Sequence, residues 1–130
     1  MKTILIVDPE FSGASTADVL NRNGFTVLRA SEAQTALTII RSGLPVDLVI
    51  TELQLPDMDG LDFLSKLKRG GSGLPVLVVT SGGSIESYLH AINLGVVEYL
   101  NKPVVSKDLS HIIRNVLDHR HYSSVSLDAA

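Results

Sequence analysis

Polar side chains that can do chemistry follow short apolar runs at four places along the chain. In an open parallel sheet, ligand sites lie at the carboxyl ends of the strands, where the strand order reverses. We therefore expect the acids, the hydroxyl groups and the lysine at these places to converge on one edge of a sheet. The residues concerned are Asp8, Pro9 and Glu10, then Thr51 and Glu52, then Thr80 and Ser81, and finally Asn101, Lys102 and Pro103.

The strands that must carry these side chains are predicted from five short runs of β-branched and aliphatic residues. Several of the runs are apolar almost throughout, which is typical of strands that are covered on both faces, as in a parallel sheet. The predicted strands cover residues 4–7, 25–28, 47–50, 76–79 and 96–100.

Helices are predicted between and after these strands, because apolar residues recur there with the spacing of one helix face. The periodic sets are Ala33, Ala36, Leu37 and Ile40; Ile85, Tyr88, Leu89 and Ile92; and Leu109, Ile112, Ile113 and Val116, which leaves Ser110, His111, Arg114 and Asn115 facing outward. Residues 11–22 and 61–68 have weaker periods but suitable boundaries. Ser31 to Gln34 fits a capping box, and Gly24, Gly43 and Gly95 stand where helices should end.

Strands that alternate with helices imply parallel strands joined by right-handed crossovers. We therefore expect an α/β fold, a single doubly wound domain with a parallel sheet between two helical layers. The domain should cover residues 1–121, and the Ser-rich residues 122–130 should form a flexible tail or a linker stub.

The composition restricts the kind of protein. Cysteine is absent from the 130 residues, which excludes disulfides, thiolate metal sites and cysteine nucleophiles. A hydrophobic fraction of 45% and a charged fraction of 19% are typical of a folded domain. The net charge of -3 argues against direct binding of nucleic acid. Every apolar run is too short for a signal peptide or a membrane span, so we expect a cytoplasmic protein without membrane contact.

Two stretches, residues 47–60 and 99–103, carry a resemblance to a known family. Together with the strand-end residues, they make residues 2–119 similar to the receiver domain of bacterial two-component response regulators. The resemblance implies a flavodoxin-like (βα)5 domain with strand order 2-1-3-4-5. It further implies that Lys102 and Thr80 contact a phosphoryl group and that Tyr99 is the switch aromatic, the ring that changes rotamer on activation. Pro103 stands at a position where the family commonly has a cis-proline.

The same resemblance implies an acidic magnesium site, and here the sequence departs from the family. Asp8 is the first acid of the usual pair and Gln54 would offer a backbone carbonyl, but Pro9 replaces the second acid and Glu52 replaces the phosphoacceptor aspartate. A displacement of about 1 Å can cost about 10²-fold where geometry is strict. We therefore expect no enzyme activity, no phosphorylation at Glu52 by the usual route, and weak or absent magnesium binding.

The longer Glu52 side chain can pair with Lys102 or Thr80 and so mimic the phosphorylated state. The leading prediction is thus an atypical or pseudo-receiver that acts as a protein-interaction module in phosphorelay signalling, held in one state by Glu52. It would contact an output domain, a protein partner or a second copy in a homodimer. The face that the resemblance implies contains Tyr88, His90, Glu98, Tyr99 and Lys107.

Other interpretations remain open at this point. A working magnesium-dependent phosphoacceptor would need Glu10 to restore a ligand, giving a metal site of Asp8, Glu10, Glu52 and Gln54. A flavodoxin-like small-molecule site is disfavoured, because its first loop should be rich in Gly, Ser and Thr. Asp57, Asp59 and Asp62 are interpreted as loop acids and helix caps. Asp118, His119 and His121 form a weak metal pattern, for which a solvated tail is the preferred explanation.

Overall fold

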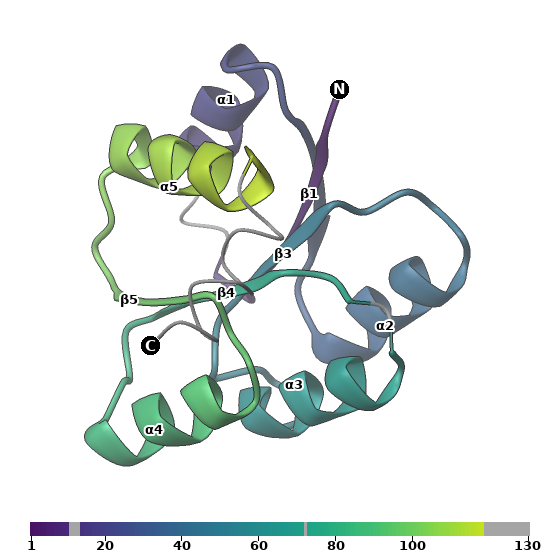
Figure 1. Cartoon of the computed structure of the whole chain (residues 1–130), viewed down its shortest axis with the longest axis vertical. Coiled ribbons are helices and arrows are strands. Elements are labelled where there is room, and N and C mark those ends of the chain that lie inside the picture. The colour runs from purple at the N-terminus through teal and green to yellow at the C-terminus, as the bar shows by residue number, and fades with distance from the viewer. Residues whose placement is uncertain (11–13, 72, 119–130) are drawn as a thin grey trace.

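Five parallel strands form one sheet between two layers of helices (Figure 1). The structure, a computed structural model, describes residues 1–10, 14–71 and 73–118. The strands are β1 (Thr3–Val7), β2 (Thr26–Ala30), β3 (Leu48–Thr51), β4 (Val76–Thr80) and β5 (Glu98–Asn101). The helices are α1 (Ala14–Arg22), α2 (Ala33–Arg41), α3 (Gly60–Arg69), α4 (Ile85–Asn93) and α5 (Ser106–Asp118). The strand order β2-β1-β3-β4-β5 confirms the predicted fold class.

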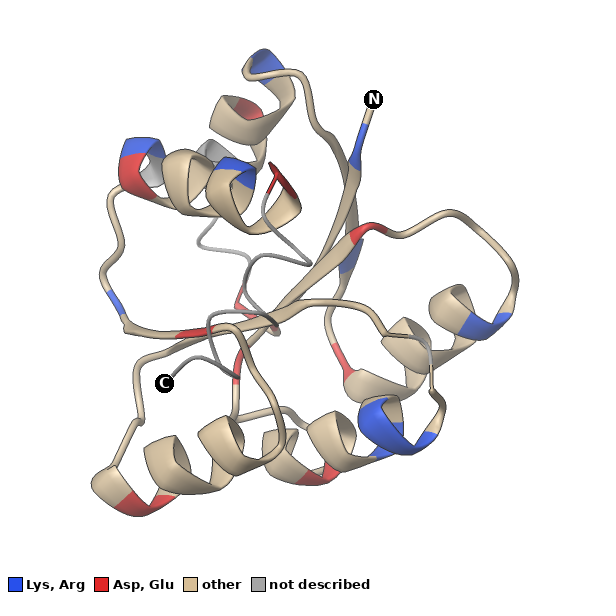
Figure 2. Ribbon diagram, viewed as in Figure 1, with Lys and Arg blue, Asp and Glu red and all other residues tan. Residues whose placement is uncertain are grey.

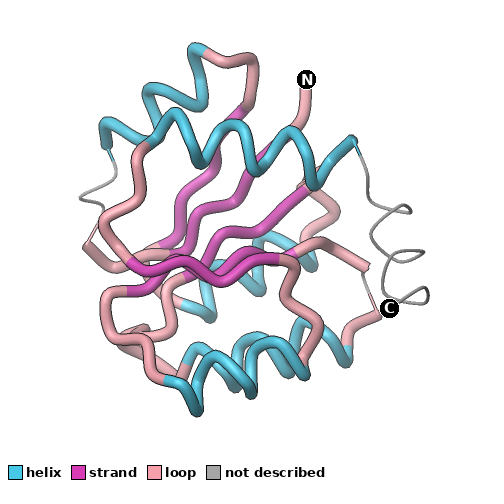
Figure 3. Tube along the Cα trace, turned by 60° about the vertical axis from the view of Figure 1, so that its left-hand side comes forward, coloured by secondary structure: helices cyan, strands magenta, loops and turns pink. Residues whose placement is uncertain are grey.

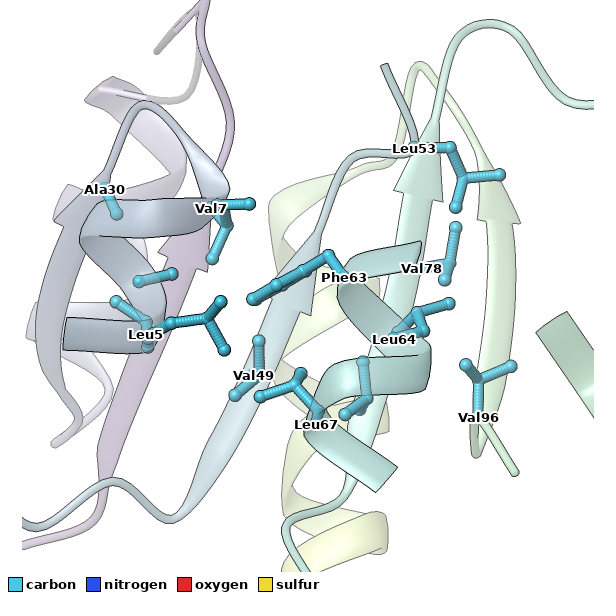
Figure 4. Close-up of a cluster of buried hydrophobic side chains, with 14 of the residues drawn as sticks. Leu5, Val7, Ala30, Val49, Leu53, Phe63, Leu64, Leu67, Val78 and Val96 are labelled. Atoms are coloured by element: carbon cyan, nitrogen blue, oxygen red, sulfur yellow. The ribbon is translucent and has the colours of Figure 1, made fainter. Parts of the chain in front are cut away.

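The sheet separates two hydrophobic clusters. Helices α1 and α5 cover one face, while α2, α3 and α4 lie on the other (Figures 1 and 3). On the second face, the fully buried ring of Phe63 packs among side chains from β1, β3 and β4 (Figure 4). On the first face, Ile113 of α5 and Leu20 of α1 are fully buried in the other cluster. Burial on both faces explains why the central strands are apolar almost throughout.

The start of α2 differs from the prediction. Glu32 is the N-cap residue and makes no side-chain cap bond, so the capping box predicted from Ser31 to Gln34 is wrong. Instead, the Asp57 carboxylate accepts hydrogen bonds from the backbone N–H groups of Ala33 at 2.9 Å and Gln34 at 2.8 Å. A residue from the β3–α3 loop thus satisfies the free donors at the helix start.

Other helix boundaries follow the sequence signals. Asp59 caps α3 by accepting from the Leu61 N–H at 2.8 Å, and Asp62 lies in the first turn. These positions confirm the interpretation of the loop acids as helix caps. Gly24, Gly43 and Gly95 follow the ends of α1, α2 and α4 with φ angles of 91°, 88° and 90°.

The periodic set in α4 predicts the helix correctly but not its buried face. Ala91 is the buried residue of α4, whereas the set Ile85, Tyr88, Leu89 and Ile92 is exposed. In α5, Leu109 and Ile113 are buried as expected, but Ser110, predicted to face outward, is buried as well. Periodicity gives the relative positions of side chains around a helix, and packing decides which side meets the sheet. None of the described helices is long and apolar enough to cross a membrane.

Candidate functional site

The carboxyl edge of the sheet brings together the polar residues that the sequence placed after its strands. Asp8 follows β1 and Glu52 follows β3, and these strands are paired so that Val7 lies opposite Thr51. Thr80 ends β4 opposite Asn101 of β5, directly before Lys102. Parallel pairing therefore aligns the strand ends, and the side chains meet across them.

Lys102 lies between two carboxylates. Its Nζ atom is 2.7 Å from Oδ2 of Asp8 and 3.3 Å from Oε1 of Glu52. Partial burial alone would lower the pKa of Lys102, but hydrogen bonding and charge from Asp8, followed by those from Glu52, outweigh it and raise the pKa. The ammonium group is therefore firmly protonated. The Lys102–Pro103 peptide bond that follows is cis.

Glu52 is a buried carboxylate whose two oxygens both have protein donors. Its side chain is only 4% exposed. Oε2 accepts from the Leu53 N–H at 2.7 Å, and Oε1 lies 3.4 Å from the Ser81 backbone nitrogen, in addition to its pairing with Lys102. Burial raises the pKa of Glu52, but the Thr80 hydroxyl, the Leu53 N–H and Lys102 together lower it below its ordinary value of 4.5. The group is ionised at neutral pH.

The backbone around Glu52 is held by a glycine contact. Gly60, the first residue of α3, donates its N–H to the Leu53 carbonyl at 2.8 Å. A Cβ atom on Gly60 would lie 2.5 Å from the Leu53 Cα atom and 2.9 Å from the Glu52 carbonyl oxygen. A glycine is required for this close approach. The start of α3 therefore fixes the strand end from which the Glu52 side chain projects.

The donor set does not fit a magnesium ion. Of the Asp8 oxygens, Oδ2 pairs with Lys102 and Oδ1 accepts from the Glu10 N–H at 2.9 Å. Pro9 and Glu10 are exposed, and Pro9 offers no side-chain ligand. Magnesium needs near-octahedral oxygen geometry. Within residues 1–10, 14–71 and 73–118, no three His, Cys, Asp or Glu side chains are arranged to hold a metal. His119, His121 and residues 122–130 lie outside the described residues.

Tyr99 connects β5 to the start of α4. Its Oη atom is 2.7 Å from Ser87 Oγ, and its ring packs edge-on against Tyr88 with centroids 5.3 Å apart. Ser87 also forms a capping box with Ser84, the N-cap residue of α4. Ser84 and Ser87 were not among the predicted site residues, and their one local signal is a spacing of three residues. Asp57 was predicted as a loop acid or helix cap, but the helix that it caps, α2, could not be predicted.

The predicted partner face is largely solvent-exposed. Tyr99 is half-buried, while the other members, Tyr88, His90, Glu98 and Lys107, are exposed.

Near the site, the Gln54 side chain lies against Gly82 in the β4–α4 loop, where a Cβ atom would collide with it. Ser81, the residue before Gly82, has its backbone nitrogen 3.4 Å and its Oγ atom 3.5 Å from Oε1 of Glu52.

Known proteins share both the sequence pattern and the fold. The family model for the response regulator receiver domain matches residues 4–114. The transcriptional regulatory protein ZraR of Escherichia coli (strain K12) is 32% identical over 127 residues, covering 97% of this chain and 28% of ZraR. The probable transcriptional regulatory protein SilR of Salmonella typhimurium is 32% identical over 117 residues, covering 90% of this chain and 51% of SilR. The chain therefore spans about a quarter to a half of the length of these relatives.

Two solved structures illustrate the likeness in three dimensions. A CheY-like receiver domain protein from Methanospirillum hungatei JF-1 superposes with a TM-score of 0.88 at 31% identity, covering 95% of this chain and 98% of that one. The beryllofluoride-activated NtrC4 receiver domain dimer gives a TM-score of 0.84 at 28% identity, covering 92% and 98%. With strand order, site position and family model in agreement, the chain belongs to the receiver domains of two-component response regulators.

Proposed function

We propose that this receiver is not phosphorylated at Glu52 and acts as a docking module in bacterial cytoplasmic signalling, without enzyme activity of its own. One observation supports this most strongly: the carboxylate at the acceptor position is already buried and occupied by protein donors. Lys102 neutralises it at 3.3 Å and the Leu53 N–H binds it at 2.7 Å. An incoming phosphoryl group would have to displace these contacts. It would also find Asp8 paired with Lys102 and no acid at Pro9.

Glu52 also makes contacts that the family resemblance assigns to a phosphoryl group. Lys102, the Thr80 hydroxyl and the Ser81 N–H all act on its carboxylate. Charge-assisted hydrogen bonds contribute about 1.5–3 kcal/mol each, which is comparable to the few kcal/mol between two conformations of a switching protein. We infer that Glu52 imitates a modified aspartate and holds the domain in one state. The hydrogen bonds of Glu52 favour one conformation of the domain only if they are stronger in that conformation than in the other.

The docking surface is proposed to be the face formed by α4, β5 and α5. Its exposed residues include Tyr88, His90, Glu98 and Lys107. Because the chain spans only part of each relative, an output domain in the same polypeptide is one candidate partner, and a separate protein or a second copy is another.

The chain can be tested directly for phosphorylation. Incubation with magnesium and either acetyl phosphate or beryllofluoride should give no acid-labile mass gain and no shift in melting temperature. The positive control is the double variant Pro9→Asp with Glu52→Asp, which restores both acids and should respond. A stoichiometric mass gain on the natural chain would overturn the proposal.

Glu10 decides what such a positive result would mean. If Glu10 supplies the missing magnesium ligand, Glu10→Gln should abolish the response of the natural chain, and a working phosphoacceptor site becomes the better description. If the double variant also fails to respond, restoring the acids at positions 9 and 52 is not sufficient for phosphorylation, and the attribution of the inactivity to these two positions fails.

A further inference from the structure

Helices α2 and α3 both end at the amino edge of the sheet, the edge opposite Glu52. Each helix follows one parallel strand and leads back to the start of another, so its last turn lies where the strands begin. The two helices pack side by side in the same layer (Figure 1). Their last turns carry four exposed cations, defined here as the α2–α3 basic patch: Arg41, Lys66, Lys68 and Arg69.

The α2–α3 basic patch lies in a part of the chain that is poor in acids. Residues 33–46 contain Arg41 and neither Asp nor Glu, and residues 63–85 contain the other three cations and neither Asp nor Glu. The acid that comes nearest along α3 is Asp62, one turn before Lys66. Figure 2 shows the basic segments at the ends of α2 and α3.

Other acids at the amino edge are paired elsewhere or lie beside a different helix. Asp47, directly before β3, is 3.9 Å from Lys2 Nζ and accepts from the Thr3 N–H at 2.7 Å. Glu98 begins β5, an outer strand of the sheet, beside α4. In the part of the chain that the structure describes, Lys2 and Lys102 form the ion pairs, and the four cations of the patch form none.

The helix ends account for only part of this charge. The carbonyl groups at a helix C-terminus act like about -0.5 elementary charge and stabilise cations there. Lys68 also reaches the end of α4, where its Nζ atom is 3.5 Å from the Asn93 carbonyl. Three helix ends together offset about 1.5 positive charges, and Asp62 offsets one more. A surplus of about 1.5 positive charges is left on an exposed surface.

An exposed leucine stands close to the α2–α3 basic patch in the chain. Leu44 is 53% exposed and follows Arg41 by three residues, in the loop between α2 and β3. An acidic peptide with an apolar residue can use both the cations and this leucine, whereas a nucleic-acid backbone uses the cations alone. The rest of the chain has seven Lys and Arg against fourteen acids, which repels a long polyanion.

We propose that the α2–α3 basic patch binds an acidic segment of a protein partner, and that Leu44 contacts an apolar residue of this segment. Complementary charge orients such a segment and speeds its association. The surface is separate from the face formed by α4, β5 and α5. Because it lies at the edge of the sheet opposite Glu52, the inference goes beyond the proposed function and holds whether or not Glu52 is phosphorylated.

A peptide selection tests the chemistry of the partner without assuming its sequence. A displayed library of short random peptides is selected on the intact chain at about 0.15 M salt, where exposed charges interact over about 8 Å. The enriched peptides should be rich in Asp and Glu and contain an aliphatic or aromatic residue. Arg69→Glu should weaken their binding by about tenfold, and Leu44→Ser by about threefold.

Arg22→Glu is the matched control for Arg69→Glu. Arg22 and Arg69 are each the exposed last residue of a helix, so both substitutions reverse one charge at a helix end and change the net charge equally. Arg22→Glu should leave peptide binding within about twofold. Circular dichroism checks that each variant is folded.

Three results would overturn the proposal. The first is a selection in which acidic peptides are enriched no more than neutral ones. The second is an equal loss of binding in Arg22→Glu and Arg69→Glu, because binding would then follow the net charge of the chain. The third uses a fluorescent DNA duplex as a second probe: duplex binding that Arg69→Glu abolishes, without enrichment of acidic peptides, would assign the α2–α3 basic patch to nucleic acid.

Discussion

Replacing Glu52 by glutamine removes one buried charge while nearly preserving shape. The amide still offers one oxygen to the Leu53 N–H, but the pairing of Lys102 with Glu52 at 3.3 Å is lost. Lys102 keeps its closer partner, Asp8, at 2.7 Å. The substitution therefore isolates the contribution of the Glu52 charge.

The expected magnitude follows from the two contacts affected. A hydrogen bond to a charged group contributes about 1.5–3 kcal/mol and a neutral one about 0.5–1.5 kcal/mol, so the Leu53 contact weakens by about 1 kcal/mol and the loss of the longer Lys102 contact costs about 1.5 kcal/mol. Part of this loss is offset, because the glutamine no longer has to desolvate a charge at a site that is 4% exposed. We expect Glu52→Gln to lower the free energy of unfolding by about 1–2 kcal/mol, measured by urea denaturation at neutral pH.

The pH dependence gives the sharper test. The folded protein lowers the pKa of Glu52 below 4.5, through hydrogen bonds and the charge of Lys102 that outweigh burial. The stabilisation is therefore fully present above the ordinary pKa and is lost as the pH falls through the lower, folded-state value. Because glutamine does not titrate, the difference between the natural chain and the variant should be constant near neutrality and shrink under acid conditions.

Glu10→Gln serves as the matched control. Glu10 is exposed, so its substitution should change the free energy of unfolding by less than about 0.5 kcal/mol. A Glu52→Gln variant as stable as the natural chain at neutral pH would show that the Glu52 charge does not stabilise the fold. A difference in stability that grows on acidification would contradict a lowered pKa of Glu52 in the folded protein.

Three further substitutions test a helix cap, a close backbone contact and a buried hydroxyl group. Asp57→Ala removes the cap that accepts from Ala33 N–H and should cost about 1 kcal/mol in urea unfolding, whereas an unchanged midpoint would exclude the cap. Gly60→Ala places a methyl group 2.5 Å from the Leu53 Cα atom and should destabilise by about 2 kcal/mol or more in thermal melts, an expectation that a normal melting temperature would contradict. Ser110→Ala should stabilise by about 0.5–1 kcal/mol, since its buried hydroxyl has no hydrogen-bond partner among the described residues; calorimetry that shows a loss would argue for a hidden partner.

The strands and their order could be predicted because burial on both faces leaves a simple record in the chain. Leu48, Val49 and Ile50 of β3 are all buried, so their run is apolar without alternation. The convergence of Asp8, Glu52 and Lys102 then follows from parallel pairing, which aligns strand ends that are far apart in sequence. The sequence does not show which carboxylates Lys102 binds; in the structure it contacts both Asp8 and Glu52.

Interactions between residues far apart in sequence could not be predicted where no sequence pattern links the two partners. Asp57 caps α2 from 24 residues downstream, while the local alternative at Glu32 makes no cap bond. The buried face of α4 was predicted wrongly. The helix has the period of an amphipathic helix, but its apolar residues around Leu89 face solvent. A helix with apolar residues on one side looks the same in sequence whether that side meets the core or awaits a partner.

The pairing of Lys102 with Glu52 has a consequence for timing. A phosphoryl group on an aspartate is removed by hydrolysis, so any state that depends on it has a limited lifetime. The Lys102–Glu52 contact is formed by the side chains of the chain itself, so its equilibrium population is maintained for as long as each copy of the protein stays folded. Under the proposed function, the duration of the signal would be set by protein synthesis, protein degradation and competition between partners, rather than by the rate of dephosphorylation within the domain.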